Sequence, residues 1–146
     1  MELFGVVYMS RATRPMKPAA LDQLLLVARA NNAMMGITGV LLYGDCRFFQ
    51  YFEGKRNDVA QIYARIRESS LHTDLIELEN QRIPERRLRK WFMGFRDVPT
   101  SLLQQLSQEQ WARELPWLQD HSTSSPGMQR LFTFLDDSQG RTPSAQ

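Results

Sequence analysis

The stretch NNAMMGITGVLLYGDCRFFQYFEG, residues 31–54, decides the fold. Two β-rich runs, 37–43 and 47–53, flank a short turn of Gly, Asp and Cys, which is the pattern of a β-hairpin. Gln50 lies in the middle of the second run, among aromatic residues. A buried amide without partners costs roughly 1–3 kcal/mol. We therefore expect a second polar group or a ligand to satisfy Gln50.

The segments on both sides of this hairpin predict a mixed fold. The other elements expected here are strand 2–9, helix 18–31, helix 57–69, strand 75–83 and strand 91–98. The first helix is expected to end near Asn31 and Asn32, because Asn is a good helix terminator. The order βαββαββ predicts an α+β, ferredoxin-like fold, with a five-stranded mixed sheet and two helices on one face.

The last third of the chain predicts a helical cap for the other face of the sheet, which is otherwise left apolar. The expected segments are helix 101–107, helix 108–118 limited by Pro116, linker 121–127 and helical segment 127–137. We therefore divide the chain into a domain at 1–98, a C-terminal helical cap at 99–137 and a disordered tail at 138–146.

Composition excludes several classes of protein. The chain has 146 residues, a net charge of +2 and one cysteine, Cys46, so no internal disulfide is possible. His72 and His121 lie far apart, and we expect no metal site. The sequence has no long apolar run, so we expect a cytoplasmic protein without a membrane segment. The basic run 82–90 is interpreted as a solvated loop, with contact to an acidic partner or to nucleic acid as the weaker alternative.

Several polar side chains are expected to meet. Side chains alternate along a strand, so Gln50 shares a face with its aromatic second neighbours. Tyr8, on a central strand, is expected to be its neighbour. With Asn31 and Asn32 they suggest a site for a flat, hydrogen-bonding ligand. Taken singly, each has a simpler reading: a core tyrosine, or asparagines that end a helix.

Three separated segments resemble the BLUF family, the blue-light sensors that use flavin. They are VVYMS (6–10), residues 31–54 and WFMGF (91–95), and the resemblance runs from Leu3 to about Asp97. It implies that the domain at 1–98 binds FAD between its two helices. The last third carries no such signature.

The resemblance also implies roles for individual residues. Tyr8 matches the photoactive tyrosine, and Gln50 the glutamine that bridges it to the flavin. Asn31 and Asn32 match residues that hold the pyrimidine end of the ring. The remaining matches are Arg65 and His72, near the ribityl and phosphate end, and Trp91 and Met93, the signal relay on the last strand. Many family members carry serine at the position of Ala28, and this departure bears on the lifetime of the lit state.

The implied mechanism is a switch and not an enzyme. Blue light excites the flavin, an electron and then a proton leave Tyr8, and recombination leaves Gln50 rotated or tautomerised. Its stronger hydrogen bond to the flavin carbonyl shifts absorption to the red. The signal is then expected to reach the C-terminal helices and a downstream regulatory protein, or to change self-association in a homo-oligomer.

Two alternatives remain open from the residues alone. One is a flavin-free, ferredoxin-like regulatory module in which Tyr8 and Gln50 satisfy each other. The other is an acyl phosphate hydrolase that uses an arginine and Asn31, although the loop after Tyr8 lacks the glycines that present backbone N–H groups to phosphate.

Overall fold

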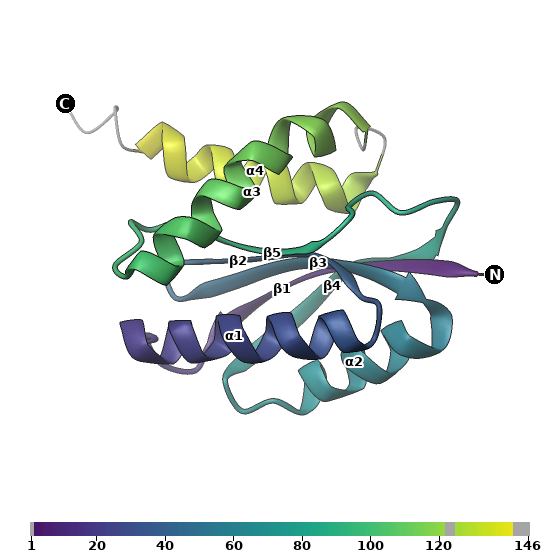
Figure 1. Ribbon diagram of the computed structural model, residues 1–146, viewed down its shortest axis with the longest axis horizontal. Helices are drawn as coiled ribbons and strands as arrows, with labels where there is room; N and C mark the ends of the chain where they lie inside the picture. Colours follow the sequence, from purple (N-terminus) through teal and green to yellow (C-terminus); the bar gives the residue numbers. More distant parts are fainter. Residues whose placement is uncertain (1, 122–124, 142–146) are drawn as a thin grey trace.

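The computed structural model describes residues 2–121 and 125–141. Its elements are β1 (Leu3–Ala12), α1 (Pro18–Met34), β2 (Thr38–Gly44), β3 (Arg47–Lys55), α2 (Arg56–Glu68), β4 (His72–Ile83), β5 (Trp91–Phe95), α3 (Leu102–His121) and α4 (Pro126–Arg141). Figure 1 shows one sheet between two helical layers, with α1 and α2 on one face and α3 and α4 on the other. The predicted α+β fold with a five-stranded mixed sheet is confirmed.

The sheet has the strand order β4-β1-β3-β2-β5. All pairs are antiparallel except β2 with β5, which run parallel. The β2–β3 turn places Asp45 and Cys46 at φ angles of 55° and 58°. Two central residues at positive φ are typical of a type I′ turn, whose twist matches that of the flanking strands.

The register brings one row of residues across the sheet. Tyr8 on β1 pairs with Gln50 on β3, Gln50 pairs with Leu41 on β2, and Leu41 pairs with Met93 on β5. Directly paired residues point to the same face of a sheet. The row therefore lies on the face that α1 and α2 cover, as their shared hydrophobic clusters show.

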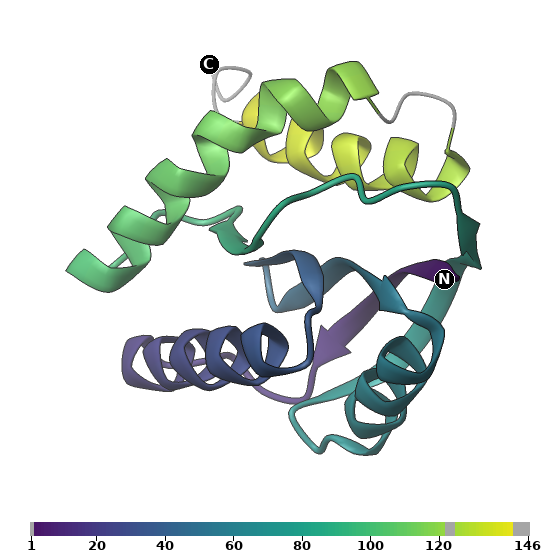
Figure 2. The ribbon, with the colours of Figure 1, turned by 45° about the vertical axis from the view of Figure 1, so that its right-hand side comes forward.

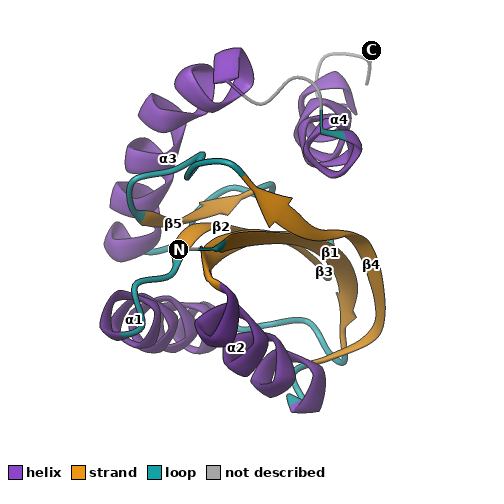
Figure 3. Cartoon of the chain, turned by 90° about the vertical axis from the view of Figure 1, so that its right-hand side faces the viewer, coloured by secondary structure: helices purple, strands orange, loops and turns teal. Residues whose placement is uncertain are grey.

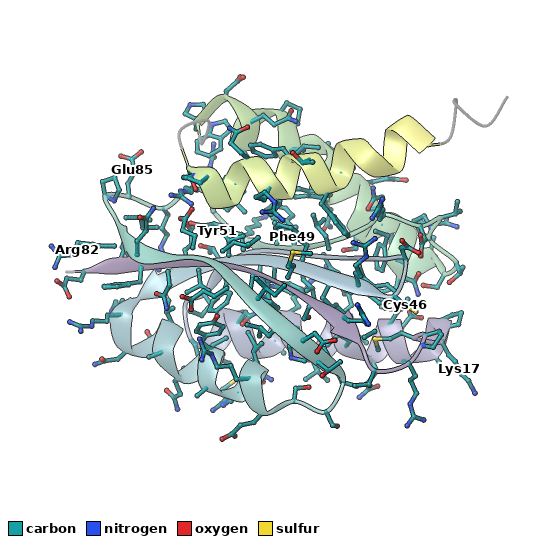
Figure 4. The ribbon with its side chains drawn as sticks, turned by 180° about the vertical axis from the view of Figure 1, so that it is seen from behind. Lys17, Cys46, Phe49, Tyr51, Arg82 and Glu85 are labelled. Carbon is teal, nitrogen blue, oxygen red and sulfur yellow. The ribbon has the colours of Figure 1, made fainter. Side chains whose placement is uncertain are left out.

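The opposite face packs against the C-terminal helices. Phe49 and Tyr51 lie on that side in Figure 4, and Figure 3 shows α3 and α4 above it. The cluster there joins these two residues to Trp111 of α3 and Leu131 of α4. The segment between β4 and β5 crosses the same face in Figures 1 and 2 and contributes buried Leu88.

The first helix extends beyond its predicted end. Asn31 and Asn32 lie in the last turns of α1, which ends at Met34. The termination signal is Gly36, at a φ of +66°, a conformation that glycine adopts without steric cost. The backbone N–H of Ile37 then donates to the Asn32 carbonyl at 2.8 Å, which closes the helix end.

The C-terminal cap differs from prediction in two ways. Residues 102–121 form one helix, with Pro116 inside it, instead of two helices. Pro116 costs a backbone hydrogen bond, but buried Trp111 and Leu118 anchor α3 on both sides of it. Helix α4 extends to Arg141, so residues 138–141 are not part of a disordered tail, and 142–146 lie outside the described residues.

Strand boundaries shift modestly. β1 runs on to Ala12 because Ser10 and Arg11 still pair with β3. β4 begins at His72, three residues before its predicted start, and β5 ends at Phe95, three residues before its predicted end. Within 2–121 and 125–141, no helix has the length and hydropathy that a membrane crossing requires.

Candidate functional site

A cavity of about 260 Å³ opens between α1, α2 and the sheet. Its walls are mainly apolar, and a few polar groups converge on it. The apolar lining consists of Leu24, Val27, Ala28, Leu41, Phe48, Ile62, Ile66 and Leu71. A concave, largely apolar site with few polar groups is typical of a small-molecule or cofactor pocket. The sequence predicted a ligand site at this place in the fold, between the two helices.

Tyr8 and Gln50 form the polar centre of the cavity. The Tyr8 hydroxyl donates to Gln50 Oε1 at 2.6 Å, and both side chains are buried. Both line the cavity, so the pair is in position to contact an occupant. Burial, and secondarily the nearby Tyr63, raise the pKa of Tyr8 above its ordinary value. Tyr8 is therefore a neutral hydrogen-bond donor at physiological pH.

Two amides in this cavity have hydrogen-bonding atoms to spare. Gln50 Nε2 and the Asn32 side chain make no hydrogen bond to any residue within the described part of the chain. Asn32 is only 5% exposed, and a buried amide normally finds a partner. Asn31 also lines the cavity but is exposed at its rim. The predicted quartet therefore comes together as expected from the sequence.

His72 and Arg65 both line the cavity, but only Arg65 has a side chain without partners among the described residues. His72 Nε2 lies 2.7 Å from the Ile66 carbonyl, and Nδ1 lies 2.7 Å from Ser10 Oγ. Nε2 donates to that carbonyl, and Nδ1 accepts from the serine hydroxyl, so both ring nitrogens are engaged. Arg65 is exposed and forms no ion pair within 2–121 and 125–141, so its guanidinium can meet an anion.

Tyr63 forms the wall behind Tyr8. The two rings stack with centroids 6.2 Å apart, and the Tyr63 hydroxyl donates to Glu77 Oε1 at 3.0 Å. Glu77 also pairs with Arg67 at 3.1 Å. Sequence reasoning missed Tyr63 and Ser10, because nothing in their spacing distinguishes them from core or surface residues.

Trp91 and Met93 lie on the side of β5 that faces α1, and Phe92 lies on the opposite side, which faces α3. Neither lines the cavity. Met93 is fully buried, and Leu41 separates it from Gln50 in the row across the sheet. Trp91 is 7% exposed, and its indole N–H has no acceptor among the residues that the structure describes.

The last strand is tied directly to α3. The Ser107 hydroxyl donates to the Met93 carbonyl at 2.6 Å, and the Phe95 N–H donates to Gln108 Oε1 at 2.6 Å. Between them, a Cβ added at Gly94 would lie 2.5 Å from Trp111 Cδ1, so glycine permits this close approach. The sequence predicted a cap on the sheet but not these polar contacts.

No cluster of potential metal ligands occurs in residues 2–121 and 125–141.

The sequence profile of a known family, "Sensors of blue-light using FAD", matches residues 3–94. A photoactivated adenylate cyclase subunit beta from Euglena longa is 37% identical over 84 residues, 58% of this chain and 10% of that protein. The blue light- and temperature-regulated antirepressor BluF of Escherichia coli K12 is 31% identical over 98 residues, 66% of this chain and 24% of that one.

Solved structures agree with these relatives. The dark-state structure of BlrB, a BLUF protein, matches with a TM-score of 0.59 and 32% identity, covering 64% of this chain and 71% of that one. The matched region spans about a tenth of the cyclase subunit and a quarter of the antirepressor. The profile match alone covers more than half of the residues, including Tyr8, Gln50 and Met93. The chain therefore belongs to the BLUF family, the sensors of blue light using FAD.

Proposed function

We propose that this chain is a light switch in which Tyr8 and Gln50 read the state of a flavin held between α1 and α2. The observation that carries the proposal is the hydrogen bond between these two side chains at the wall of an apolar cavity. The family uses FAD, and its BLUF domain is a sensor rather than a catalytic domain.

The cavity residues fit a flavin. Its ring is flat and carries acceptors and a donor along one edge, which amides can match because they offer both. Gln50 Nε2 and the Asn32 amide are two groups inside the cavity with unused hydrogen bonds. Asn31 and Arg65 stand at the rim, where Arg65 would meet the phosphates. His72 shapes the wall, since Ser10 and Ile66 already hold its ring.

The same amides weigh against a flavin-free module. In that reading Tyr8 and Gln50 satisfy each other, and the structure does contain their hydrogen bond. It would still leave Gln50 Nε2 and a nearly buried Asn32 side chain lining the cavity without a partner in the described fold, where a ligand can meet them.

When bound, the flavin supplies blue-light absorption and an electron acceptor in its excited state. Tyr8 holds the electron and the proton that can leave, and its raised pKa keeps that proton in place in the dark. Gln50 Oε1 accepts a hydrogen bond from the Tyr8 hydroxyl, while Gln50 Nε2 is free to contact the flavin ring. Rotation or tautomerisation of the amide exchanges these roles, and buried side chains around it hold each state.

The output route runs through β5 to α3. Gln50 and Met93 are separated by one intervening strand, β2, through Leu41. The Met93 carbonyl is held by Ser107, so movement of β5 reaches α3 without an intervening loop. We propose that α3 and α4 pass this change to a regulatory partner protein or to a second copy of the chain. Trp91 is the first residue of the same strand and would report its position.

Two substitutions test the photoactive pair. Gln50→Leu removes the amide at similar volume and is expected to keep flavin but abolish the light-induced red shift. Tyr8→Phe is expected to do the same, by removing the hydroxyl that donates to Gln50. Bound flavin and its absorption before and after blue light are measured in each variant. A normal photocycle in either variant would contradict the role assigned to that residue.

A further inference from the structure

A second hollow, which we call the basic hollow, lies at the start of β5, against the C-terminal part of α1. Its volume is about 570 Å³, and no residue that lines it also lines the flavin cavity. Arg29 and Ala33 face it from α1, whereas Ala28 and Asn31 face the flavin cavity. With 3.6 residues per turn these two sets occupy different faces of the helix, so α1 separates the two sites.

Four cationic side chains surround this hollow. They are Arg29 of α1 and Arg86, Arg89 and Lys90 of the segment before β5. None of the four forms an ion pair with a described residue, and no acidic residue lines the hollow. Four like charges without counter-charges repel one another, which favours an anionic occupant.

The direct contacts of these cations are with neutral groups. Arg86 Nη1 donates to the Thr38 hydroxyl at 2.9 Å, and that hydroxyl donates to the buried Glu53 carboxylate at 2.7 Å, so one of the four cations is linked to an acid through Thr38. The Arg89 guanidinium lies 5.9 Å from the centre of the Trp117 ring. The acids next to the lining residues along the chain, Glu85 beside Arg86 and Glu109 beside Gln110, do not line the hollow. Glu85 is exposed and is labelled in Figure 4.

The floor of the hollow is apolar. Ile37, Trp91 and Phe92 contribute to it, and all three are under 9% exposed. Because so little of either aromatic ring is open, the floor offers no face on which a nucleobase can stack. Gln110 of α3 completes the wall with an exposed amide.

We propose that the basic hollow binds an acidic segment of a protein partner. Arginine matches the geometry of a carboxylate with two parallel hydrogen bonds, and the hollow carries three arginines and a lysine. Their placement on two separate elements suits several negative charges along one chain, and the apolar floor suits one aliphatic side chain between them. The binding of this partner does not depend on the proposed function. Only the further step, in which the partner receives the light signal, rests on it.

The test is fluorescence anisotropy in the dark, at physiological salt, with the flavin-loaded full chain. The probe is a short peptide of Glu and Asp with one central Leu, labelled with a dye that is excited by red light, which the flavin does not absorb. Arg89→Gln combined with Lys90→Gln removes two of the four cations and is expected to weaken binding about tenfold. The matched control, Arg14→Gln with Lys17→Gln, makes the same charge change with exposed residues and is expected to alter binding less than about twofold.

The control pair is remote from the hollow. Lys17 and Glu85 lie at opposite ends of the molecule in Figure 4, and Glu85 directly precedes the segment that carries Arg86, Arg89 and Lys90. Arg29→Gln, on a different element, is expected to weaken binding as well, which covers the case in which the double variant fails to fold.

Three results would overturn the proposal. They are no measurable binding by the unsubstituted protein, equal weakening in the hollow and control variants, or tighter binding of inorganic phosphate or a single-stranded oligonucleotide at the same cations. Binding in the dark depends on the hollow alone, so its failure leaves the light sensor untouched. The sensor fails separately, by losing its flavin spectrum or its red shift.

Discussion

Ser107→Ala tests whether β5 drives α3. The substitution removes the hydroxyl that donates to the Met93 carbonyl at 2.6 Å, while Ser107 itself is 2% exposed. Water cannot readily replace this donor at such a buried site. A buried carbonyl left without its partner costs about 1–3 kcal/mol, and alanine otherwise suits a helix interior. We therefore expect the free energy of unfolding to fall by about 1–3 kcal/mol.

The functional effect is measured separately from stability. Blue light is expected to change amide hydrogen exchange in α3 of the unsubstituted protein, measured by mass spectrometry. Ser107→Ala is expected to keep the flavin red shift, because Gln50 and Tyr8 are untouched, but to lose most of the light-dependent difference in α3. Both urea unfolding and hydrogen exchange are needed, since a weaker helix alone would exchange faster in the dark and in the light.

Ser101→Ala is the matched control, because Ser101 directly precedes α3 and its half-buried hydroxyl donates to Asp22 at 2.7 Å and accepts from the Gln104 N–H at 3.1 Å, without touching β5. Loss of this helix cap is expected to cost about 1 kcal/mol and to preserve the light-dependent difference. The relay account is refuted if Ser107→Ala retains the full light-dependent change in α3, or if both variants lose it equally.

Two further predictions concern the buried polar groups. Glu53 is fully buried and accepts from Thr38 Oγ1 and the N–H groups of Arg87 and Leu88, so Glu53→Ala is expected to destabilise by about 3–5 kcal/mol in urea unfolding; a loss below about 1 kcal/mol would contradict this. Burial raises the pKa of Tyr8 and Tyr51 above 10. The unfolded chain therefore loses these protons first, and their contribution to stability declines as pH rises above about 10. In the folded protein at pH 10, Tyr8 and Tyr51 are expected to stay protonated and to contribute no phenolate absorbance, as at neutral pH. Phenolate absorbance that shows these two tyrosines half-ionised in the folded protein would contradict this prediction.

The hairpin and the Tyr8–Gln50 meeting were predictable from sequence because alternation along strands is strict. Because side chains alternate along a strand, the sequence determines which residues of β3 share a face with Gln50. The register between β1 and β3 then sets Tyr8 as its partner. The family resemblance supplied the cofactor and the proposed roles of Asn32 and Met93, which no periodicity reveals.

The helix boundaries were harder, because tertiary packing overrides local signals. Asn31 and Asn32 suggested an early end to α1, but Gly36 provides the positive φ that ends it. Pro116 suggested a break, but packing around it maintains α3. The Ser107 contact was not predictable, since a serine in a helix gives no sign of a strand carbonyl beside it.

The basic hollow shows a different limit of sequence reasoning. The run at 82–90 was interpreted as a solvated loop, and Arg82 at its start does pair with Glu2 at the surface. Its later part instead joins Arg29, which is almost sixty residues away along the chain. Only the fold places these charges around one hollow.

The most direct test of the central claim is the visible absorption spectrum of the purified chain, recorded in the dark and immediately after blue light. The account predicts a flavin spectrum that shifts to the red and returns in darkness, with the shift absent in Gln50→Leu. A flavin spectrum that does not respond to light would contradict the switch, and a folded, colourless protein that takes up no added FAD would contradict the cavity assignment itself.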